Sequence, residues 1–206
     1  MTATRGRPRG TSKRELELIA MRLFDERGFE ETTVEQIAAA AGISGRTFFR
    51  YFPTKAEVLW YQFDAEVAAL RAAFADMPED VPMMTAVRRV VVNANRYRAE
   101  DVPELRTRMR LVSSIPALAA TAGAHYDAWE RAVGAFAAAR LDQPEDALIP
   151  LAVGRCTLAA ARAAFDAWLG RADTDLTVYL DEALTALARG FAPDVPAGFG
   201  GEGSRV

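Results

Sequence analysis

Four polar side chains near residue 50 have types and a spacing suited to contacting DNA. They are Arg46, Thr47, Arg50 and Tyr51. In a helix, residues that are one, four and five positions apart lie on the same side, so these side chains share a face. Arginine can bond guanine edges or phosphates, and the hydroxyl groups of threonine and tyrosine can reach phosphates. This face suits a DNA major groove, and a solvated polar surface is the alternative.

The opposite face of the same helix is apolar and must hold it against a core. Phe48 and Phe52 are four residues apart and point away from the polar face. Ser44 can cap the start of this helix, and Pro53 must end it. The sequence therefore predicts a short helix with one buried face and one free face.

Two more helices are predicted ahead of this one. Residues 12–15 form a capping box, which is followed by an apolar stripe that ends at Gly28. Residues 32–35 form a second capping box, and that helix ends at Gly42, a residue suited to a tight turn. Two short helices joined by a tight glycine turn are typical of a helix-turn-helix.

The chain begins with a basic arm. Arg5, Arg7 and Arg9 are separated by glycine and proline, a composition that cannot pack but can follow a phosphate backbone. A solvated tail is the alternative. The 206-residue chain has a net charge of -3, so this basic end is balanced by an acidic remainder. We expect the two parts to have different partners.

The overall composition is that of a folded protein. Hydrophobic residues make up 50% of the chain and charged residues 26%, which excludes a wholly disordered chain. We find no secretory signal, and no uninterrupted apolar stretch long enough to span a membrane. The single cysteine, Cys156, excludes an internal disulfide and fits a reducing compartment. We therefore expect a cytoplasmic protein.

The sequence does not favour catalysis. One histidine and one cysteine exclude the usual zinc sites, and there is no Gly-rich phosphate loop or serine hydrolase set. We expect neither an enzyme, nor a cofactor, nor a metal site. A helical enzyme that uses only carboxylates and a DNA-packaging protein indifferent to sequence are the alternatives.

Beyond residue 55 the chain is rich in alanine, lacks any strand pattern and is predicted to be helical almost throughout. A third capping box, at residues 54–57, is predicted to open a long fourth helix. Later helices are expected at residues 83–94, 101–113, 116–141, 144–168 and 174–191.

The apolar residues of the last two predicted helices indicate a homodimer. Helix 144–168 is apolar on nearly all sides, which would be costly on the surface of a monomer. Together with helix 174–191 from each subunit, it would form a four-helix homodimer interface with two-fold symmetry. The alternative places helix 144–168 at the centre of a monomeric bundle. A symmetric dimer predicts a near-palindromic operator in double-stranded DNA.

Large apolar side chains between the later helices are candidates for a ligand cavity, with ordinary core packing as the alternative. They are Phe74, Met83, Met84, Met109, Trp129, Phe136, Phe165 and Trp168. Arg106, in a run with Arg108 and Arg110, is a candidate for an anionic head group, and a solvated or salt-bridged face is the alternative. His125 lies on or near the apolar stripe of its helix, where a hydrogen-bonded core position is the alternative to a ligand contact.

Three motifs in the first sixty residues carry a family resemblance. They are Ala20-x-x-Leu23-Phe24-x-x-x-Gly28-Phe29, then Thr32-Thr33-Val34-x-x-Ile37-Ala38-x-x-Ala41-Gly42-Ile43-Ser44, and Thr47-Phe48-Phe49-Arg50-Tyr51-Phe52-x-x-Lys55. This segment resembles the DNA-binding domain of the TetR family of bacterial transcriptional regulators. Family members usually have an aromatic pair followed by histidine where this chain has Phe49-Arg50-Tyr51.

The resemblance implies a role for each matching residue. Contacts to the DNA backbone are implied for Thr33, Ser44, Thr47, Phe49, Tyr51 and Lys55. Gly45 and Arg46 are implied to lie near bases, and the arginines of residues 5–9 to enter the minor groove. An all-α architecture of nine helices is implied as well. The expected domains are a flexible basic arm (1–11), a helix-turn-helix domain (12–56), a ligand-binding and dimerisation domain (57–191) and a disordered tail (192–206).

A narrower resemblance extends over most of the chain. Its motifs are Arg46-Thr47-Phe48-Phe49-Arg50-Tyr51-Phe52, Leu59-Trp60, Phe63-Asp64, Arg106-x-Arg108-Met109, Pro116-Ala117-Leu118 and Tyr126-x-x-Trp129. They are similar to the mycofactocin-system subgroup of TetR regulators. The resemblance implies a repressor released by an acyl-CoA-like effector, with the acyl chain in an apolar cavity and the CoA phosphates near arginines. The alternative is a regulator of an efflux or catabolic gene that responds to a drug-like or aromatic ligand.

Overall fold

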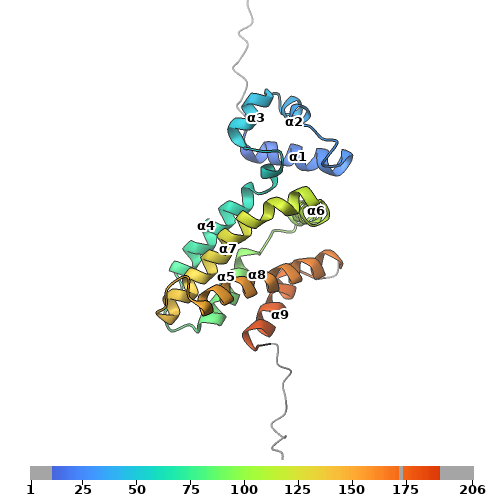
Figure 1. The fold of residues 1–206 in the computed structure, drawn as a ribbon. Coiled ribbons are helices and arrows are strands. Elements are labelled where there is room, and N and C mark those ends of the chain that lie inside the picture. The colour runs from blue at the N-terminus through green and yellow to red at the C-terminus, as the bar shows by residue number, and fades with distance from the viewer. Residues whose placement is uncertain (1–10, 172–173, 191–206) are drawn as a thin grey trace, which may run out of the picture.

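The computed structural model describes residues 11–171 and 174–190, and these contain nine α-helices, one short 3-10 helix and no strand (Figure 1). The elements are α1 (Lys13–Arg27), α2 (Val34–Ala40), α3 (Gly45–Tyr51), η1 (Ala56–Leu59), α4 (Tyr61–Ala75), α5 (Met83–Ala94), α6 (Val102–Ser114), α7 (Pro116–Leu141), α8 (Leu148–Leu169) and α9 (Leu176–Ala188). The predicted all-α architecture of nine helices is confirmed within this part of the chain. The expected basic arm, up to residue 10, and the expected tail lie outside the described residues.

The start of α2 differs by one residue from the prediction. Thr33 caps this helix, and Thr33 and Gln36 form the capping box, with each side chain bonded to the other residue's backbone. Thr32 is instead fully buried, and its hydroxyl donates to the carbonyl oxygens of Leu23 and Gly28. A buried hydroxyl needs an internal partner, so Thr32 ties the loop to α1 and leaves the cap to its neighbour.

The fourth helix begins later than the third capping box predicts. The hydroxyl of Thr54 does accept from the backbone N–H of Glu57, at 3.2 Å, but the turn that follows is the 3-10 helix η1. The consecutive residues 58–60 are all buried there. Trp60 also donates its indole N–H to the hydroxyl of Thr121 on α7, at 2.9 Å. The turn is therefore covered on several sides, and η1 serves as a tight connector between α3 and α4.

The last two helices are also shorter than predicted. The segment from residue 143 to residue 147 forms a turn, and α8 begins only at Leu148. Asp142 ends α7 in the left-handed region, with φ of 51°. The N-cap of α9 is Asp175, whose carboxylate accepts from the backbone N–H of Thr177 at 2.8 Å. A side-chain cap therefore sets the start of α9, whereas Ala147 at the start of α8 supplies none.

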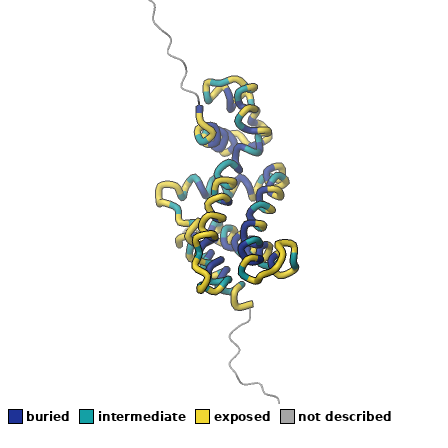
Figure 2. The backbone as a smooth tube through the Cα atoms, turned by 90° about the vertical axis from the view of Figure 1, so that its left-hand side faces the viewer, coloured by how far each residue is buried: buried dark blue, intermediate teal, exposed yellow. Residues whose placement is uncertain are grey.

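Two buried clusters form the core of the described chain (Figure 2). The first joins α1, α2 and α3 with η1, and it also takes in Leu111 and Val112 of α6 and Leu118 and Ala122 of α7. The second lies among α4 to α9. The three-helix unit therefore rests on α6 and on the first half of α7, at the end of the molecule away from α9 (Figure 1).

One helix, α8, is long and apolar enough by length and composition to cross a membrane, with a mean hydropathy of 1.4. Arg155, Arg162 and Asp166 interrupt its apolar residues, so the expectation that no uninterrupted apolar stretch could span a membrane is not contradicted. The composition has a structural explanation in this fold, because α8 packs against both α7 and α9. Leu158, Ala161, Ala164 and Trp168 of α8 are buried. A helix covered on two sides by other helices needs apolar residues around most of its circumference.

Two glycines allow α7 and α8 to approach closely. A Cβ atom at Gly154 of α8 would lie 2.5 Å from the carbonyl oxygen of Glu130, and one at Gly134 of α7 would lie 3.2 Å from that of Pro150. The first distance is far below van der Waals contact, so this crossing requires glycine at position 154.

We expect Gly154→Ala to lower the free energy of unfolding by about 1–3 kcal/mol, because the added methyl group overpacks the crossing of the helices. The matched control is Gly123→Ala on α7, where a Cβ meets nothing within 4 Å. That change should stabilise the protein by about 0.5–1 kcal/mol through helix propensity. Urea denaturation followed by circular dichroism measures both, and a gain from both substitutions would contradict the close approach.

Candidate DNA-contacting surface and ligand cavity

Helix α3 presents two different faces. Phe48 is fully buried, with its ring centroid 5.8 Å from that of the buried Phe52. On the other side Arg46 and Arg50 are exposed, and Phe49 is 53% exposed. The predicted division is confirmed for the core residues Phe48 and Phe52 and for the two arginines, whereas Thr47 and Tyr51 of the predicted free face are half-buried. A half-exposed phenylalanine between two exposed arginines can contact a DNA backbone.

The turn between α2 and α3 holds this face in place. Gly42 adopts φ of 68°, a conformation that side chains rarely take, and Ile43 then donates its backbone N–H to Ala38 at 2.9 Å. Ser44 caps α3, accepting from the backbone N–H of Thr47 at 3.2 Å, and the two hydroxyl oxygens lie 3.0 Å apart. The geometry is that of a helix-turn-helix.

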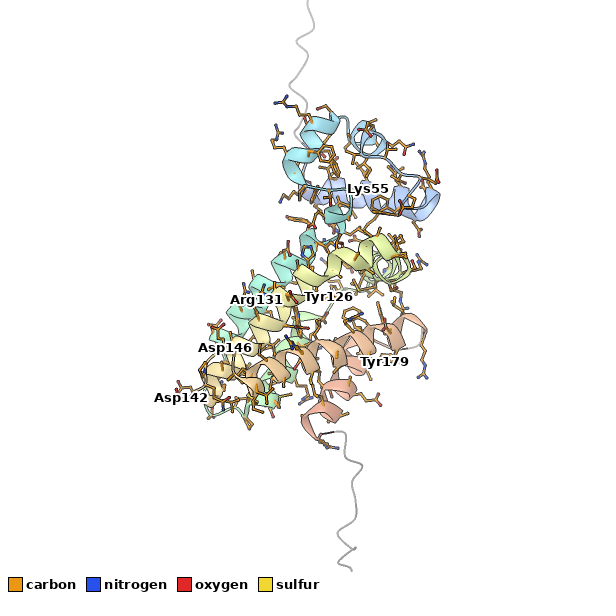
Figure 3. All side chains as sticks on the ribbon, in the orientation of Figure 1. Lys55, Tyr126, Arg131, Asp142, Asp146 and Tyr179 are labelled. Carbon is orange, nitrogen blue, oxygen red and sulfur yellow. The ribbon has the colours of Figure 1, made fainter. Side chains whose placement is uncertain are left out.

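Lys55 and Tyr51 have partners inside the protein. Lys55 donates from Nζ to the carbonyl oxygens of Phe29, at 2.5 Å, and Thr32, at 2.8 Å, and Figure 3 labels it in the three-helix unit. An ammonium group has three donors, so one remains for a phosphate. Tyr51 donates its hydroxyl to the carbonyl oxygen of Thr11, at 2.9 Å, and so fixes the point where the basic arm joins the fold.

The predicted DNA-contacting residues fall into three groups. The exposed ones are Thr33, Ser44, Arg46, Phe49 and Arg50, and the half-buried ones are Gly45, Thr47, Tyr51 and Lys55. Arg5, Arg7 and Arg9 lie outside the described residues. The first two groups lie on the start of α2, on the turn and α3, and just beyond α3. Their contacts with DNA remain a prediction.

A cavity of about 470 Å³ lies among the helices below this unit. Its walls are mostly apolar and aromatic: Leu59, Trp60, Phe63, Leu70, Ala94, Leu105, Met109, Val112, Ala119, Ala122, Tyr126, Trp129, Leu158, Ala161, Phe165 and Leu169. Tyr126 of α7 is labelled in Figure 3, near the middle of the molecule. A cavity of this size with apolar walls suits a small apolar molecule or an acyl chain.

Polar residues complete the lining of the cavity. Burial raises the pKa of Glu66, and the hydroxyl of Tyr97 donates to its Oε1 at 3.2 Å. Burial likewise raises the pKa of Tyr97, because burial disfavours the charged form of each group. Arg108 donates from Nη1 to Oε1 of Gln62 on α4 at 2.6 Å. The remaining polar lining residues are Asn95, Ser113, Arg162 and Asp166.

Three of the ten predicted ligand-binding residues line this cavity: Met109, Trp129 and Phe165. Phe74 and Phe136 do not, because their rings stack on each other with centroids 4.4 Å apart in the core. Met83 packs against the same core, and Met84 is half-buried without lining the cavity.

The other three predicted ligand-binding residues hold helices together. Arg106 lies 3.9 Å from the ring of buried Trp168 and donates to the carbonyl oxygens of Trp168 and Arg171. His125 stacks on Trp60, with ring centroids 4.7 Å apart, and its Nδ1 lies 2.8 Å from Oδ1 of Asp64. These contacts account for Arg106, His125 and Trp168 without a ligand.

Sequence reasoning did not single out Glu66, Tyr97 or Arg162 as cavity residues. Tyr97 lies between α5 and α6, where no helical period applies, and Glu66 has the spacing of a solvated helix position. Among the polar lining residues, the sequence pattern pointed only to Arg108, which belongs to the alternating arginines of α6.

We expect Glu66→Gln to stabilise the protein at neutral pH, because the amide keeps an acceptor for Tyr97 and removes the cost of burying a charge. The folded protein has the raised pKa, so the wild type loses stability as pH rises above the ordinary glutamate value. The advantage of the variant should therefore shrink as pH falls toward that value. Thermal unfolding from pH 4 to 8 measures it, and a pH-independent difference would contradict the assignment.

An exposed recognition helix held by a tight turn, above a helical body with an apolar cavity, defines a helix-turn-helix regulator with a ligand-binding domain. Comparisons with known proteins name the family. The profile of bacterial regulatory proteins of the tetR family matches residues 19–60, and that of the MftR C-terminal domain matches residues 81–192. The chain belongs to the TetR family of transcriptional regulators.

The relatives agree with this assignment. The chain is 29% identical to a mycofactocin biosynthesis transcriptional regulator, MftR, of Mycobacterium tuberculosis, over 90% of this chain and 93% of that protein. It is 32% identical to the HTH-type transcriptional regulator TcmR of Streptomyces glaucescens, over 90% of each. In fold it is similar to Thermus thermophilus FadR, a TetR family repressor in complex with lauroyl-CoA, with 24% identity, a TM-score of 0.55 and coverage of 92% and 100%.

Family membership bears on three predictions from the sequence: DNA binding instead of catalysis, assembly as a dimer, and location in the cell. TetR regulators are DNA-binding proteins rather than enzymes, and they act as dimers on operators in response to small molecules. They are in general cytoplasmic.

Proposed function

We propose that this chain is a repressor that binds a near-palindromic operator as a homodimer and leaves it when an acyl-CoA-like effector occupies the cavity. The single observation that carries the proposal is a 470 Å³ cavity with mainly apolar walls in the helical body on which the DNA-binding unit rests. Residues 1–56 would then bind DNA, and residues 57–191 would bind the ligand and form the dimer interface.

An acyl chain suits the lining of this cavity. The aromatic and aliphatic walls offer no fixed pattern of polar groups along most of their length, which fits a flexible chain better than a polar drug. Arg162 lines the cavity but is itself exposed, so it is available for a CoA phosphate at the mouth. The likeness to the MftR C-terminal domain and to the lauroyl-CoA complex of FadR supports the same ligand class.

Exposed apolar residues on the last two helices support the dimer. Leu148 and Leu151 of α8 are 79% and 37% exposed, and Val178 of α9 is 52% exposed. A second copy related by two-fold symmetry would cover them in a four-helix interface. Recognition helices in such a dimer reach half-sites about one turn of DNA, or a multiple of a turn, apart.

The decisive experiment measures fluorescence anisotropy on labelled DNA from upstream of the protein's own gene, at fixed salt, with random DNA as the control. We expect specific binding that lauroyl-CoA abolishes and that a detergent at equal concentration does not. If only triclosan-like aromatic compounds released the protein from DNA, the proposed ligand class would be wrong and the assignment as a repressor would stand. Equal binding to random DNA would indicate a packaging protein instead.

We expect Arg46→Ala to weaken binding to the operator by about 1–3 kcal/mol if its exposed guanidinium reads a base, and to weaken binding to random DNA much less. Anisotropy titrations on both DNAs measure the difference. An equal loss on both would assign Arg46 to the phosphate backbone.

A further inference from the structure

A cluster of charged residues joins the ligand cavity to the DNA-binding unit. It consists of Arg14 and Glu17 on α1 and of Glu104 and Arg108 on α6, and we call it the α1–α6 charge cluster. Glu17 is 0% exposed, and the side chain of Arg108 is 7% exposed. Arg108 also lines the cavity. The same guanidinium therefore belongs both to the ligand cavity and to the contact with the DNA-binding unit.

The pairing of Arg108 within this cluster is incomplete. Its Nη2 donates to Oε1 of Glu104 at 2.9 Å and lies 2.8 Å from Oε1 of Glu17. That second contact lacks hydrogen-bond geometry, so Oε1 of Glu17 receives no hydrogen bond, and Nε of Arg108 has no partner within residues 11–171 and 174–190. A buried N–H without an acceptor is costly, and the residue that carries it lines the cavity, so a guanidinium that turns toward the cavity could take an acceptor from a ligand.

We propose that the carbonyl oxygen of an acyl thioester bonds to Arg108 and competes with Glu17 for it, so that the bound ligand loosens α1 from α6. This inference rests on the proposed function, since it needs an acyl-CoA-like effector in the cavity. The donors of arginine form a rigid planar fork, so a guanidinium that turns toward a ligand oxygen takes Nη2 away from Glu17.

A Glu17 carboxylate that loses its contact with Arg108 is buried with one cation fewer, which is energetically unfavourable. Its remaining partner is Arg14, which donates from Nη1 to Oε2 at 2.9 Å. Burial raises the pKa of Glu17, so its ionised form depends on both arginines. A buried carboxylate that loses one of two cations favours separation of α1 from α6, and α1 shares its core with α3. The recognition helix would then shift, and by linkage DNA binding would weaken ligand binding equally.

The first test needs no ligand. Glu17→Gln keeps the shape of the side chain and removes its charge, so it removes the ionic attraction between α1 and Arg108 that the ligand is proposed to weaken. We expect it to weaken operator binding about tenfold, a typical size for an allosteric coupling. The matched control is Asp25→Asn, because Asp25 pairs with Arg110 at 3.3 Å between the same two helices but is exposed and outside the cavity. Asp25→Asn should change operator affinity by less than about twofold.

The second test uses two probes, lauroyl-CoA and S-dodecyl-CoA, a thioether without the carbonyl oxygen. Lauroyl-CoA should bind Glu17→Gln several-fold more tightly than wild type, because the competitor for Arg108 has lost its charge. S-dodecyl-CoA should bind both proteins equally. Isothermal titration calorimetry measures these affinities, and thermal unfolding checks that the variant folds. Damage to the fold would weaken the binding of both probes.

The outcomes separate this inference from the proposed function. An operator affinity that Glu17→Gln leaves unchanged, or that Asp25→Asn lowers as much, overturns the inference even when lauroyl-CoA releases wild type from DNA. Equal changes for the two probes also overturn it. If the wild-type protein binds its operator but binds neither CoA compound, the proposed ligand class is wrong. The thioester contact of Arg108 is then wrong as well.

Discussion

Phe48→Ala should lower the free energy of unfolding by about 3–5 kcal/mol and abolish specific DNA binding. Phe48 is fully buried, and its ring packs at 5.8 Å from Phe52 and 5.7 Å from Phe49. Removal of a buried phenyl ring costs its transfer free energy and leaves a cavity. Because α3 has seven residues, tertiary packing must supply most of its stability. Urea denaturation followed by circular dichroism measures the loss.

The neighbouring residue provides the matched control for this prediction. Phe49 is 53% exposed, so Phe49→Ala should change stability by less than about 0.5 kcal/mol. It should still weaken DNA binding, since its position faces outward from α3. If both variants unfolded equally easily, the two-faced description of α3 would be wrong.

Ala161→Phe should block the ligand cavity and leave DNA binding intact. Ala161 lies on α8, is 6% exposed and lines the 470 Å³ cavity. An added phenyl ring would occupy the space of the acyl chain. The bound ligand would then overpack the cavity at a cost of about 1–3 kcal/mol, which lowers the affinity for lauroyl-CoA by about one to two orders of magnitude. Operator release by lauroyl-CoA, followed by anisotropy, should then require correspondingly more ligand.

The control for the blocked cavity is Ala68→Phe on α4, an exposed position that does not line the cavity. It should release DNA at the wild-type concentration of lauroyl-CoA. Unchanged release from Ala161→Phe would place the effector elsewhere in the protein.

The sequence by itself determined the features that depend on neighbouring residues. Caps at Ser12 and Ser44 and the positive φ of Gly42 set the helix-turn-helix, because each acts within a few residues of the chain. The separation of Phe48 from the arginines of α3 follows from helical periodicity alone. The exception at the start of α2 depended on tertiary structure, since the burial of Thr32 made Thr33 the cap.

The tertiary structure decided which residues line the cavity and how it is joined to the DNA-binding unit. A cavity is the space left where helices cross, and periodicity cannot tell a residue beside it from a core residue such as Phe136, which stacks on Phe74 instead. Arg106 and Arg108 are two positions apart in one helix, yet the first is bound to α8 and the second lies against Glu17 of α1. Contacts between residues so far apart in sequence depend on how the helices pack, because the helical period fixes only the face on which each side chain lies.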